Sequence, residues 1–389
     1  MRVLHVVAYF APAFKYGGPP RTVLGLCRAL QESGVGVDVF TTSADGASDF
    51  PASPAEGDVY DGIRVRYFPR CFPKRFFRAA DLEEALAASV CNYDLVHVHG
   101  LWNFTVWSAV RMVRHSPVPY IISPRGMLDS GSTAHQKWRK AVAYRLIERK
   151  NLESAARLHA TSACELDSLK ACGFADKAFQ LANGFDAPSE IPARSSFRQR
   201  LQVSGSAPLI TYLGRIHPTK RLDLLCTAFG RLRTRCPEAH LVIAGPDDEQ
   251  FRRKIQPLFQ PLARAVTWTG ELGPEDKWAL LHDSTVFVMC SDSESFGVSV
   301  VEAMAAGVPV VVTRTCPWHE VENVGCGFWV EQTPAAIAEV LEWIVCNPSA
   351  AAEMGSLGRG LAHRQYGWNA IAAAMIGRYC EALSGVKAD

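Results

Sequence analysis

The sequence predicts an α/β protein made of two doubly wound domains, each with a parallel sheet covered by helices on both faces. Short β-branched runs alternate with segments of helical periodicity, which is typical of parallel strands joined by crossover helices. The alternation begins afresh after a polar stretch near residues 185–200. The length of 389 residues agrees with this organisation, since domains average roughly 150 residues.

In the first half, strands and helices alternate from the first residues onward. The apolar run 2–8 predicts a strand, and it is followed by a Gly/Pro loop. Apolar residues then recur at helical spacing over 20–32, which predicts a helix. Further strands are expected at 35–42, 95–99 and 119–123.

The second half repeats the pattern and ends in an alanine-rich helical region. We expect one domain over 1–190, a second over 191–365, and a last helix at about 366–389 that is a candidate to pack back on the first domain. The expected strands of the second half are 209–213, 240–244, 265–269, 285–290 and 309–313, and the expected helices are 222–232 and 298–306.

Charge and cysteine content exclude several classes of protein. The chain carries 41 Lys and Arg against 39 Asp and Glu, and neither half is strongly basic, so a general nucleic-acid binder is not expected. The 12 cysteines form no CxxC pair, which favours reduced thiols in a cytoplasmic protein. We expect neither a signal peptide nor a membrane-spanning segment, because no window offers about 18 uninterrupted apolar residues.

The first candidate site is the loop between the first strand and the first helix. Adjacent Gly17 and Gly18 let the backbone approach a ligand closely, and the start of the following helix offers N–H groups suited to a phosphate. The alternative is a Gly/Pro turn that binds nothing. The spacing is not GxGxxG, so a nicotinamide dinucleotide is not predicted.

The second candidate site is the segment GRIHPTK at 214–220, directly after the strand 209–213. Its two cations, Arg215 and Lys220, could hold a diphosphate without a metal ion. A solvated surface pair is the alternative. The segment is not a Walker loop, because GxxxxGK[ST] is absent.

The third candidate site follows the strand 285–290. Glu294 precedes the expected helix and Glu302 lies near its second turn, so two carboxylates can face one crevice. The N–H groups of Phe296, Gly297 and Val298 lie at the helix N-terminus, where an anion is favoured. The alternative makes Glu294 a capping residue and Glu302 a surface residue. An acidic metal site is not expected, because an apolar helix follows at once.

The fourth candidate site joins two loops of the first half. His97 and His99 alternate with valines and point to one face of their strand. His99, at the strand end, could reach a ligand, whereas His97 is expected to be a structural histidine. Arg125 follows the next strand as a fixed charge, and Asp129 could orient either Arg125 or an acceptor hydroxyl. A structural role is the alternative for each residue.

Taken together, these segments resemble the retaining nucleotide-sugar glycosyltransferases of the GT-B fold, in the large family 4 group. The markers are GG at 17–18, NGFD at 183–186, GRIHPTK at 214–220, VIAGPD at 242–247 and ESFGVSVVEA at 294–303. The last marker fits the family's pair of glutamates separated by seven residues. The resemblance covers nearly the whole chain, and the order and spacing of the markers make it specific.

The resemblance implies two Rossmann-like domains that face each other across a cleft, with a nucleotide-sugar donor between them. Arg215 and Lys220 would bind the donor diphosphate and stabilise it as it leaves, and Gly17 with Gly18 would approach that phosphate. Glu302 would bind the ribose. Glu294, together with the Phe296 to Val298 backbone, would hold the transferred sugar. No metal and no further cofactor are implied, and the leaving phosphate would help to deprotonate the acceptor.

One position departs from the family pattern. Many relatives have a histidine that contacts the sugar after the strand equivalent to 119–123, where this chain has Pro124, Arg125 and Gly126. Either Arg125 or His99 could replace that histidine. The segments SPRGMLD, ATSACE and GCGFWV resemble a branch involved in bacterial surface polysaccharide (exopolysaccharide) assembly.

Two basic segments rich in aromatic residues bear on the acceptor. Residues 64–78 and 135–157 could lie on an anionic membrane surface, which would suit a lipid-linked saccharide at the cytoplasmic face. A solvated basic helix and a loop with inward-packed aromatics are the alternative.

The resemblance therefore implies a hexosyltransferase that uses a nucleotide sugar, UDP rather than GDP, and a saccharide or lipid-linked saccharide acceptor. Two other functions remain open. A catalytically silent sugar-nucleotide binder or scaffold would account for the missing histidine, and a nucleotide-sugar epimerase would use the same fold.

Overall fold

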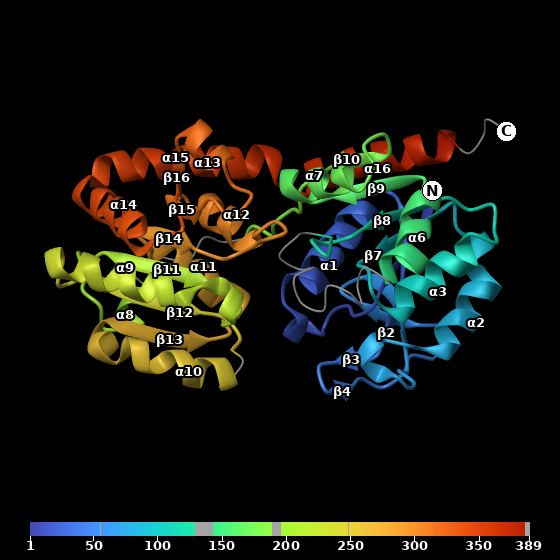
Figure 1. Ribbon diagram of the computed structural model, residues 1–389, viewed down its shortest axis with the longest axis horizontal. Helices are drawn as coiled ribbons and strands as arrows, with labels where there is room; N and C mark the ends of the chain where they lie inside the picture. Colours follow the sequence, from blue (N-terminus) through green and yellow to red (C-terminus); the bar gives the residue numbers. More distant parts are fainter. Residues whose placement is uncertain (55, 129–142, 189–195, 248, 386–389) are drawn as a thin grey trace. The chain divides into compact units, whose positions relative to one another are not determined.

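The computed structural model describes residues 1–54, 56–128, 143–188, 196–247 and 249–385, and the chain divides into two compact units (Figure 1). Unit 1 comprises Met1–Gly184 and Trp368–Asp389, and unit 2 comprises Phe185–Gly367. The chain thus enters unit 2 six residues before the expected start at 191 and leaves it two residues after the expected end at 365. The last helix belongs to unit 1.

Unit 1 is built on an eight-stranded sheet with the order β10-β9-β8-β7-β1-β2-β6-β5. All neighbouring strands are parallel except β5 and β6. Its central strands are apolar along their whole length because helices cover both faces. The strands are β1 (Arg2–Val7), β2 (Gly36–Thr42), β5 (Asp58–Tyr60), β6 (Ile63–Phe68), β7 (Leu95–His99), β8 (Tyr120–Ser123), β9 (Arg157–Ala160) and β10 (Ala178–Gln180), beside a hairpin of β3 (Ala44–Asp45) and β4 (Ser48–Asp49).

The helices of unit 1 pack on the two faces of this sheet (Figure 1). One face is covered by α1 and α16, which contribute Leu26 and Met375 to the core. The other face packs against α2 and α3 through Leu86 and Val110. The helices are α1 (Gly18–Glu32), α2 (Ala80–Ser89), α3 (Phe104–Val113), α6 (Arg149–Ser154), α7 (Ala163–Ala171) and α16 (Trp368–Ser384), with short turns η1 (Phe14–Tyr16), η2 (Lys74–Phe76), η3 (Val90–Asn92) and the π-helix η4 (Tyr144–Glu148).

Unit 2 has a six-stranded parallel sheet with the order β13-β12-β11-β14-β15-β16. The strands are β11 (Leu209–Leu213), β12 (His240–Ala244), β13 (Val266–Gly270), β14 (Val286–Met289), β15 (Val310–Thr313) and β16 (Gly327–Val330). The helices are α8 (Ser196–Arg200), α9 (Leu222–Arg235), α10 (Glu249–Phe259), α11 (Pro274–Asp283), α12 (Val298–Ala305), α13 (Glu320–Val324), α14 (Pro334–Cys346) and α15 (Pro348–Gln365), with the turns η5 (Pro218–Lys220) and η6 (Gln260–Ala265). The predicted pair of doubly wound α/β domains is confirmed.

Each sheet reverses its strand order at one point. In unit 1 the chain runs outward from β1 to β2 on one side and continues through β7 on the other. In unit 2 the same reversal lies between β11 and β14. Ligands of open α/β sheets bind beyond the carboxyl ends of the strands at such reversals. The loops after β1, β7 and β8, and those after β11 and β14, are therefore where each unit is expected to bind.

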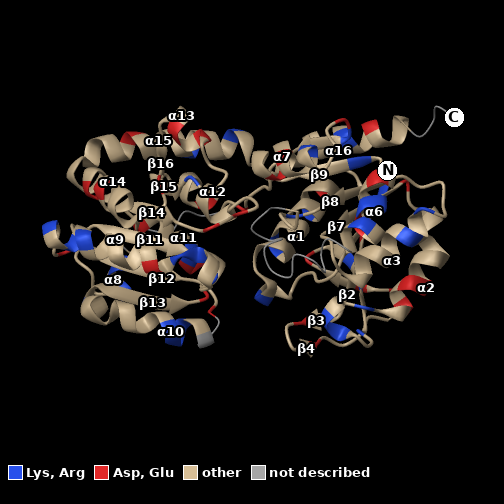
Figure 2. Ribbon diagram, viewed as in Figure 1, with Lys and Arg blue, Asp and Glu red and all other residues tan. Residues whose placement is uncertain are grey.

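Acidic and basic residues are interspersed along the ribbons of both units (Figure 2), and the formal net charge is +2. None of the described helices is long and apolar enough to cross a membrane.

The two basic segments agree only in part with the alternative of a solvated basic helix and a loop, because the first begins in a strand whereas the described part of the second is mostly helical. Residues 64–68 belong to β6, where exposed Arg64 alternates with buried Ile63 and Val65. In the second segment, residues 135–142 lie outside the described residues, and the remainder forms η4, α6 and the start of β9.

The glycine at position 25 of α1 is required by its contact with α16. A Cβ atom at Gly25 would lie 2.3 Å from the ring of Trp368, and one at Gly184 would come equally close to the same indole. We expect Gly25→Ala to lower the free energy of unfolding by about 2 kcal/mol, because overpacking outweighs the gain of about 1 kcal/mol in helix propensity. Urea unfolding of the variant measures this. Gly18→Ala in the same helix is the matched control, since a Cβ there meets nothing within 4 Å. Equal stability of the two variants would contradict the expected packing.

Candidate functional site

The strand reversal of unit 2 brings two candidate loops together. The segment Gly214–Lys220 follows β11, and the segment Cys290–Gly297 follows β14, and these strands are neighbours. The backbone N–H of Asp292 donates to the carbonyl of Thr219 at 2.8 Å, and Arg221 pairs with Asp292 at 3.0 Å. The two loops are therefore fixed to each other.

Lys220 and Glu294 form an ion pair at the centre of these loops. The Nζ–Oε1 distance is 2.5 Å, and the side chains are only 15% and 12% exposed. The Ser291 hydroxyl donates to the same carboxylate oxygen at 2.6 Å. Glu294 is thus held in one orientation, as a residue that must meet a ligand hydroxyl would need to be.

Glu294 does not cap the helix that follows it. The N-cap of α12 is Gly297, with φ +86°, and this N-cap position has no capping side chain. Phe296 packs against Trp318, whose indole N–H donates to the Phe296 carbonyl. The backbone of Phe296, Gly297 and Val298 is therefore rigid at the N-terminus of α12, a position that favours an anion.

Glu302 is buried and paired rather than exposed. It is 9% exposed overall, and its Oε1 lies 2.5 Å from Nζ of Lys277. Lys277 is on α11, and no sequence pattern points to it, because it lies 25 residues from Glu302. Lys277 holds Glu302 in the buried second turn of α12.

Arg215 is the exposed cation of this site. Within the described residues its side chain forms no ion pair, whereas its carbonyl accepts from the Tyr212 hydroxyl at 2.9 Å. The loop therefore has a fixed backbone and a cationic side chain available to a ligand.

In unit 1, the Gly17–Gly18 loop leads from η1 into α1. Gly17 has φ +90° and is the N-cap, without a capping side chain. The start of α1 offers fewer free N–H donors than expected from the sequence, because Pro19 and Pro20 follow Gly18 and carry no N–H. Gly18 alone of these three first-turn residues can donate to a ligand.

Substitution of Gly18 tests whether a ligand comes close to the backbone at this position, because the fold itself does not require glycine there. Its φ is not in the left-handed region, and a Cβ atom would meet no atom within 4 Å. The resemblance implies that Gly18 approaches the donor phosphate, so we expect Gly18→Val to weaken donor binding by about tenfold, or 1.4 kcal/mol, with the midpoint of unfolding unchanged. Calorimetric titration with the nucleotide sugar checks this. Unchanged affinity would exclude Gly18 from the donor site.

Arg125 and His99 are in direct contact beyond the ends of β8 and β7. Arg125 Nη2 donates to His99 Nδ1 at 3.1 Å, and Arg125 Nη1 donates to Asn183 at 2.7 Å. His99 is 2% exposed, whereas Arg125 is partly exposed. Of the two candidates to replace the family histidine, Arg125 is the one that can reach a ligand. Asp129 lies outside the described residues.

A row of buried polar residues lies on the face of the unit 1 sheet that α1 and α16 cover. Strand register places His5 opposite His97, and His99 opposite Ser123. Arg125 can only donate, so His99 Nδ1 must accept, and His99 Nε2–H then donates to His5 Nδ1 at 2.9 Å. His5 therefore carries its proton on Nε2, which is buried without a partner among the described residues.

A second chain of hydrogen bonds crosses the same face. His159 Nε2–H must donate to the Leu181 carbonyl, so its Nδ1 accepts from the Ser123 hydroxyl at 2.7 Å. The Ser123 oxygen then accepts from His97 Nε2–H, and His97 Nδ1 accepts from the Tyr379 hydroxyl, each at 2.7 Å. The sequence expectation for His97 as a structurally hydrogen-bonded histidine agrees with these contacts. His5 and His159 were missed, because their partners lie far away in sequence.

These four histidines are neutral. Burial, with the nearby charge of Arg125, lowers the pKa of His5 and of His159 to about 3. Burial and the neighbouring histidines and Arg125 also hold the pKa of His97 and His99 well below the usual value.

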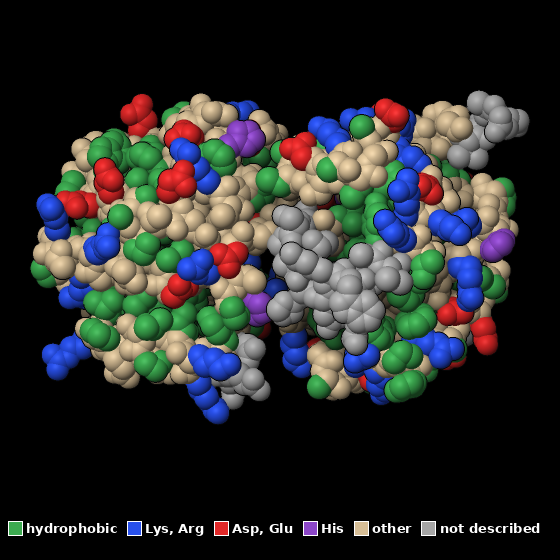
Figure 3. Space-filling view, viewed as in Figure 1, with side chains coloured by type: hydrophobic (Ala, Val, Ile, Leu, Met, Phe, Trp, Pro, Cys, Tyr) green, Lys and Arg blue, Asp and Glu red, His purple; other side chains and the backbone are tan. Residues whose placement is uncertain are grey.

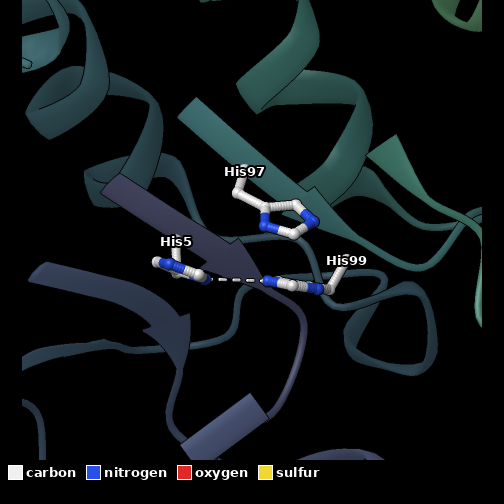
Figure 4. Close-up of side chains that lie close together, drawn as sticks. All are labelled: His5, His97 and His99. Carbon is white, nitrogen blue, oxygen red and sulfur yellow. Dashed lines mark hydrogen bonds between the residues drawn. The ribbon is translucent and has the colours of Figure 1, made fainter. Parts of the chain in front are cut away.

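The donor set of His5, His97 and His99 does not fit a metal ion. Their ligand atoms lie within 4.8 Å of one another, and Figure 4 shows ring nitrogens of His5 and His99 facing each other. A metal ion binds the lone pair of a neutral imidazole. In this network each of those lone pairs already accepts a hydrogen bond. The cluster is therefore a hydrogen-bond network.

Comparison with known proteins agrees with this geometry. Residues 193–360 match the family model "Glycosyl transferases group 1", and residues 17–184 match the "Glycosyl transferase 4-like domain". A D-inositol 3-phosphate glycosyltransferase of Catenulispora acidiphila is 26% identical over 95% of this chain and 92% of its own.

Two solved structures share the fold over nearly their whole length. A sucrose-phosphate synthase from Thermosynechococcus elongatus superposes with a TM-score of 0.81 at 22% identity, covering 99% of both chains. Anabaena Alr3699/HepE in complex with UDP-glucose gives a TM-score of 0.73 at 19% identity, covering 99% of this chain and 100% of that one.

Proposed function

Because both halves of the chain match glycosyltransferase models, the chain belongs to the GT-B glycosyltransferases of the family 4 type, and we propose that it is a retaining, metal-independent hexosyltransferase of polysaccharide biosynthesis. It is an enzyme that uses a nucleotide-sugar donor. The proposed donor is a UDP-hexose, and the proposed acceptor is a saccharide or a lipid-linked saccharide.

The observation that carries this proposal is the pairing of Lys220 with Glu294 next to the N-terminus of α12. A diphosphate leaving group gains negative charge in the transition state, and fixed cations with backbone N–H groups stabilise that charge. Lys220 and the free side chain of Arg215 supply the cations. Because these two residues neutralise the phosphates, no metal ion is required in the proposed reaction.

The two carboxylates have separate proposed roles. Glu294, oriented by Lys220 and Ser291, accepts from hydroxyls of the transferred sugar. Glu302, paired with Lys277, accepts from the ribose hydroxyls. Neither role requires a covalent intermediate. The bond from the anomeric carbon to the phosphate oxygen breaks, the acceptor oxygen forms its bond on the same face, and the departing phosphate receives the acceptor proton, so that the configuration is retained. The choice of uridine is supported by the Anabaena protein, which was solved with UDP-glucose.

Exposed aromatic and basic side chains of unit 1 support a peripheral contact with an anionic membrane. Phe72 is 85% exposed beside Lys74 and Arg75, and Leu146 is 66% exposed beside Arg145. In the space-filling view, blue basic side chains of unit 1 lie next to green hydrophobic ones (Figure 3). Such surfaces bind anionic lipid headgroups, which supports a lipid-linked acceptor at the cytoplasmic face.

The second candidate function is a silent sugar-nucleotide binder, and the observation that favours it is Arg125 in place of the family histidine. The ion pairs of Glu294 with Lys220 and of Glu302 with Lys277 favour the enzyme. A binder would not need a rigidly oriented carboxylate at the sugar.

Proton NMR of the purified protein with UDP-, GDP- and ADP-sugars in EDTA tests the proposal. Turnover of one UDP-sugar, with the α anomer released first from an α-linked donor, is the expected result. Consumption only after a divalent metal is added would overturn metal independence. Line broadening without turnover, even with lipid-linked saccharides added, would favour the silent binder.

A further inference from the structure

The guanidinium of Arg125 is a partly buried cation that has no compensating anion among the residues that the structure describes. Its three hydrogen-bond partners are Asn183 at 2.7 Å, His99 at 3.1 Å and Thr22 at 3.4 Å, all neutral. Within the described residues no carboxylate forms an ion pair with it. A charge removed from water without a counter-charge costs several kcal/mol, so this arrangement is unfavourable unless a ligand compensates it.

The carboxylate of Glu165 already accepts other hydrogen bonds. Burial lowers the pKa of Arg125 and the charge of Glu165 acts in the opposite direction, but the two oxygens of Glu165 accept from Gly126 N at 2.6 Å and from Thr161 N and Oγ1 at 2.7 and 2.8 Å. Glu165 therefore anchors the loop and does not neutralise the guanidinium through a hydrogen bond.

Arg125 retains two N–H donors that no described residue accepts. A guanidinium has five N–H donors, and the three contacts use both Nη1 protons and one on Nη2. Nε is buried without a partner, and one Nη2 proton remains. Nε and Nη2 are neighbouring donors, the pair that can bind both oxygens of a carboxylate or phosphate.

The backbone keeps Arg125 in place at an energetic cost. Its φ is +58°, in the left-handed region, and Gly126 follows with φ +74°. A non-glycine residue there costs of order 1–3 kcal/mol and persists where the surroundings determine it. Thr22, one of its partners, lies in the second turn of α1, whose N-terminal end adds positive potential.

We propose that Arg125 is the centre of an oxyanion site in unit 1, which takes a carboxylate or phosphate group of a substrate, with His99 and Asn183 as positioning residues. That the anion belongs to the donor or acceptor of sugar transfer rests on the proposed function. The existence of an oxyanion site at Arg125 does not rest on it. The anion comes either from the donor diphosphate or from an acidic group on the acceptor.

NMR of protein labelled with 15Nε-arginine tests the proposal, because the Arg125 Nε–H signal is identified by its loss in Arg125→Lys. Wild type and Lys220→Ala are titrated with inorganic phosphate, glucuronate and UDP. A saturable Arg125 shift with phosphate or glucuronate that persists in Lys220→Ala supports the site with an acceptor as the source. A shift with UDP alone, lost in Lys220→Ala, supports it with the donor as the source. No Arg125 shift with any of the three overturns it.

Asn183→Asp provides a second test that leaves the shape of the side chain unchanged. The new carboxylate would occupy the position of the amide beside Arg125 and act as an internal counter-ion, so oxyanion affinity is expected to fall at least tenfold. The exposed Asn92→Asp adds the same charge elsewhere and is the matched control. Equal affinities in the two variants would overturn the proposal. Both readouts are of binding, so failure of transfer activity alone does not affect them.

Discussion

Glu294→Gln should lower kcat for sugar transfer by about 10²–10³-fold, which corresponds to a loss of about 3–4 kcal/mol in the transition state, while the donor Kd changes by less than a factor of about three. Glutamine keeps the size of the side chain and can still accept from Lys220 and Ser291, so the loop is retained. What is lost is the negative charge that, in the proposed reaction, accepts from the hydroxyls of the transferred sugar. Initial rates at saturating donor, with calorimetry for binding, measure the two effects separately.

Lys220→Ala is the matched comparison and should behave differently. It removes a cation that binds the diphosphate in the ground state and in the transition state, and it leaves Glu294, 12% exposed, without its counter-charge. Both donor affinity and kcat should fall. If the two variants instead retain transfer rates near those of the wild type, the assignment of this ion pair to the donor site is wrong.

Acidification should destabilise unit 1 strongly between pH 6.5 and pH 3. In the unfolded chain each buried histidine has a pKa near 6.5, whereas burial lowers the folded pKa of His5 and His159 to about 3. Below pH 6.5 the unfolded state therefore binds more protons, and stability falls as pH falls. Four such histidines imply a loss of about 5 kcal/mol between pH 7.5 and pH 5.5, comparable with the total stability of many domains.

Proton uptake gives the direct measurement of this effect. When the protein unfolds in urea at pH 5.5, these four histidines together should bind roughly three to four protons from the solvent. His159→Gln should reduce that number by about one. His319→Gln, at an exposed position, is the control and should leave uptake by the buried set unchanged. A midpoint of unfolding that is independent of pH over this interval would contradict the neutral network.

The alternation of strands and helices could be predicted because it depends on local periodicity. The predicted strand 209–213 coincides with β11, and the predicted helix 298–306 differs from α12 by one residue. The strand β6 was not predicted, because its arginines were interpreted as part of a basic surface segment. Exposed Arg64 between buried Ile63 and Val65 nevertheless has the alternation of a strand. That signal was available in the sequence.

The contacts that hold the site together could not be predicted, because they join residues far apart in the chain. Lys277 has no motif of its own and becomes informative only when α11 brings it to Glu302. In the same way, Tyr379 reaches His97 across 282 positions. By contrast, the sequence alone shows that Pro19 and Pro20 supply no N–H donors at the start of α1.

The position of α16 has a consequence for synthesis on the ribosome. Unit 2 is one continuous segment, Phe185–Gly367, whereas unit 1 needs Trp368 and Tyr379 from the last helix to complete its core. At translation rates of about 5–20 residues per second, unit 2 takes roughly 10–40 s to emerge. Throughout that time the sheet face bearing the four histidines lacks its final cover. Unit 1 is therefore made first but cannot complete its core until α16 has been translated, and until then part of this sheet face lacks the cover that α16 provides.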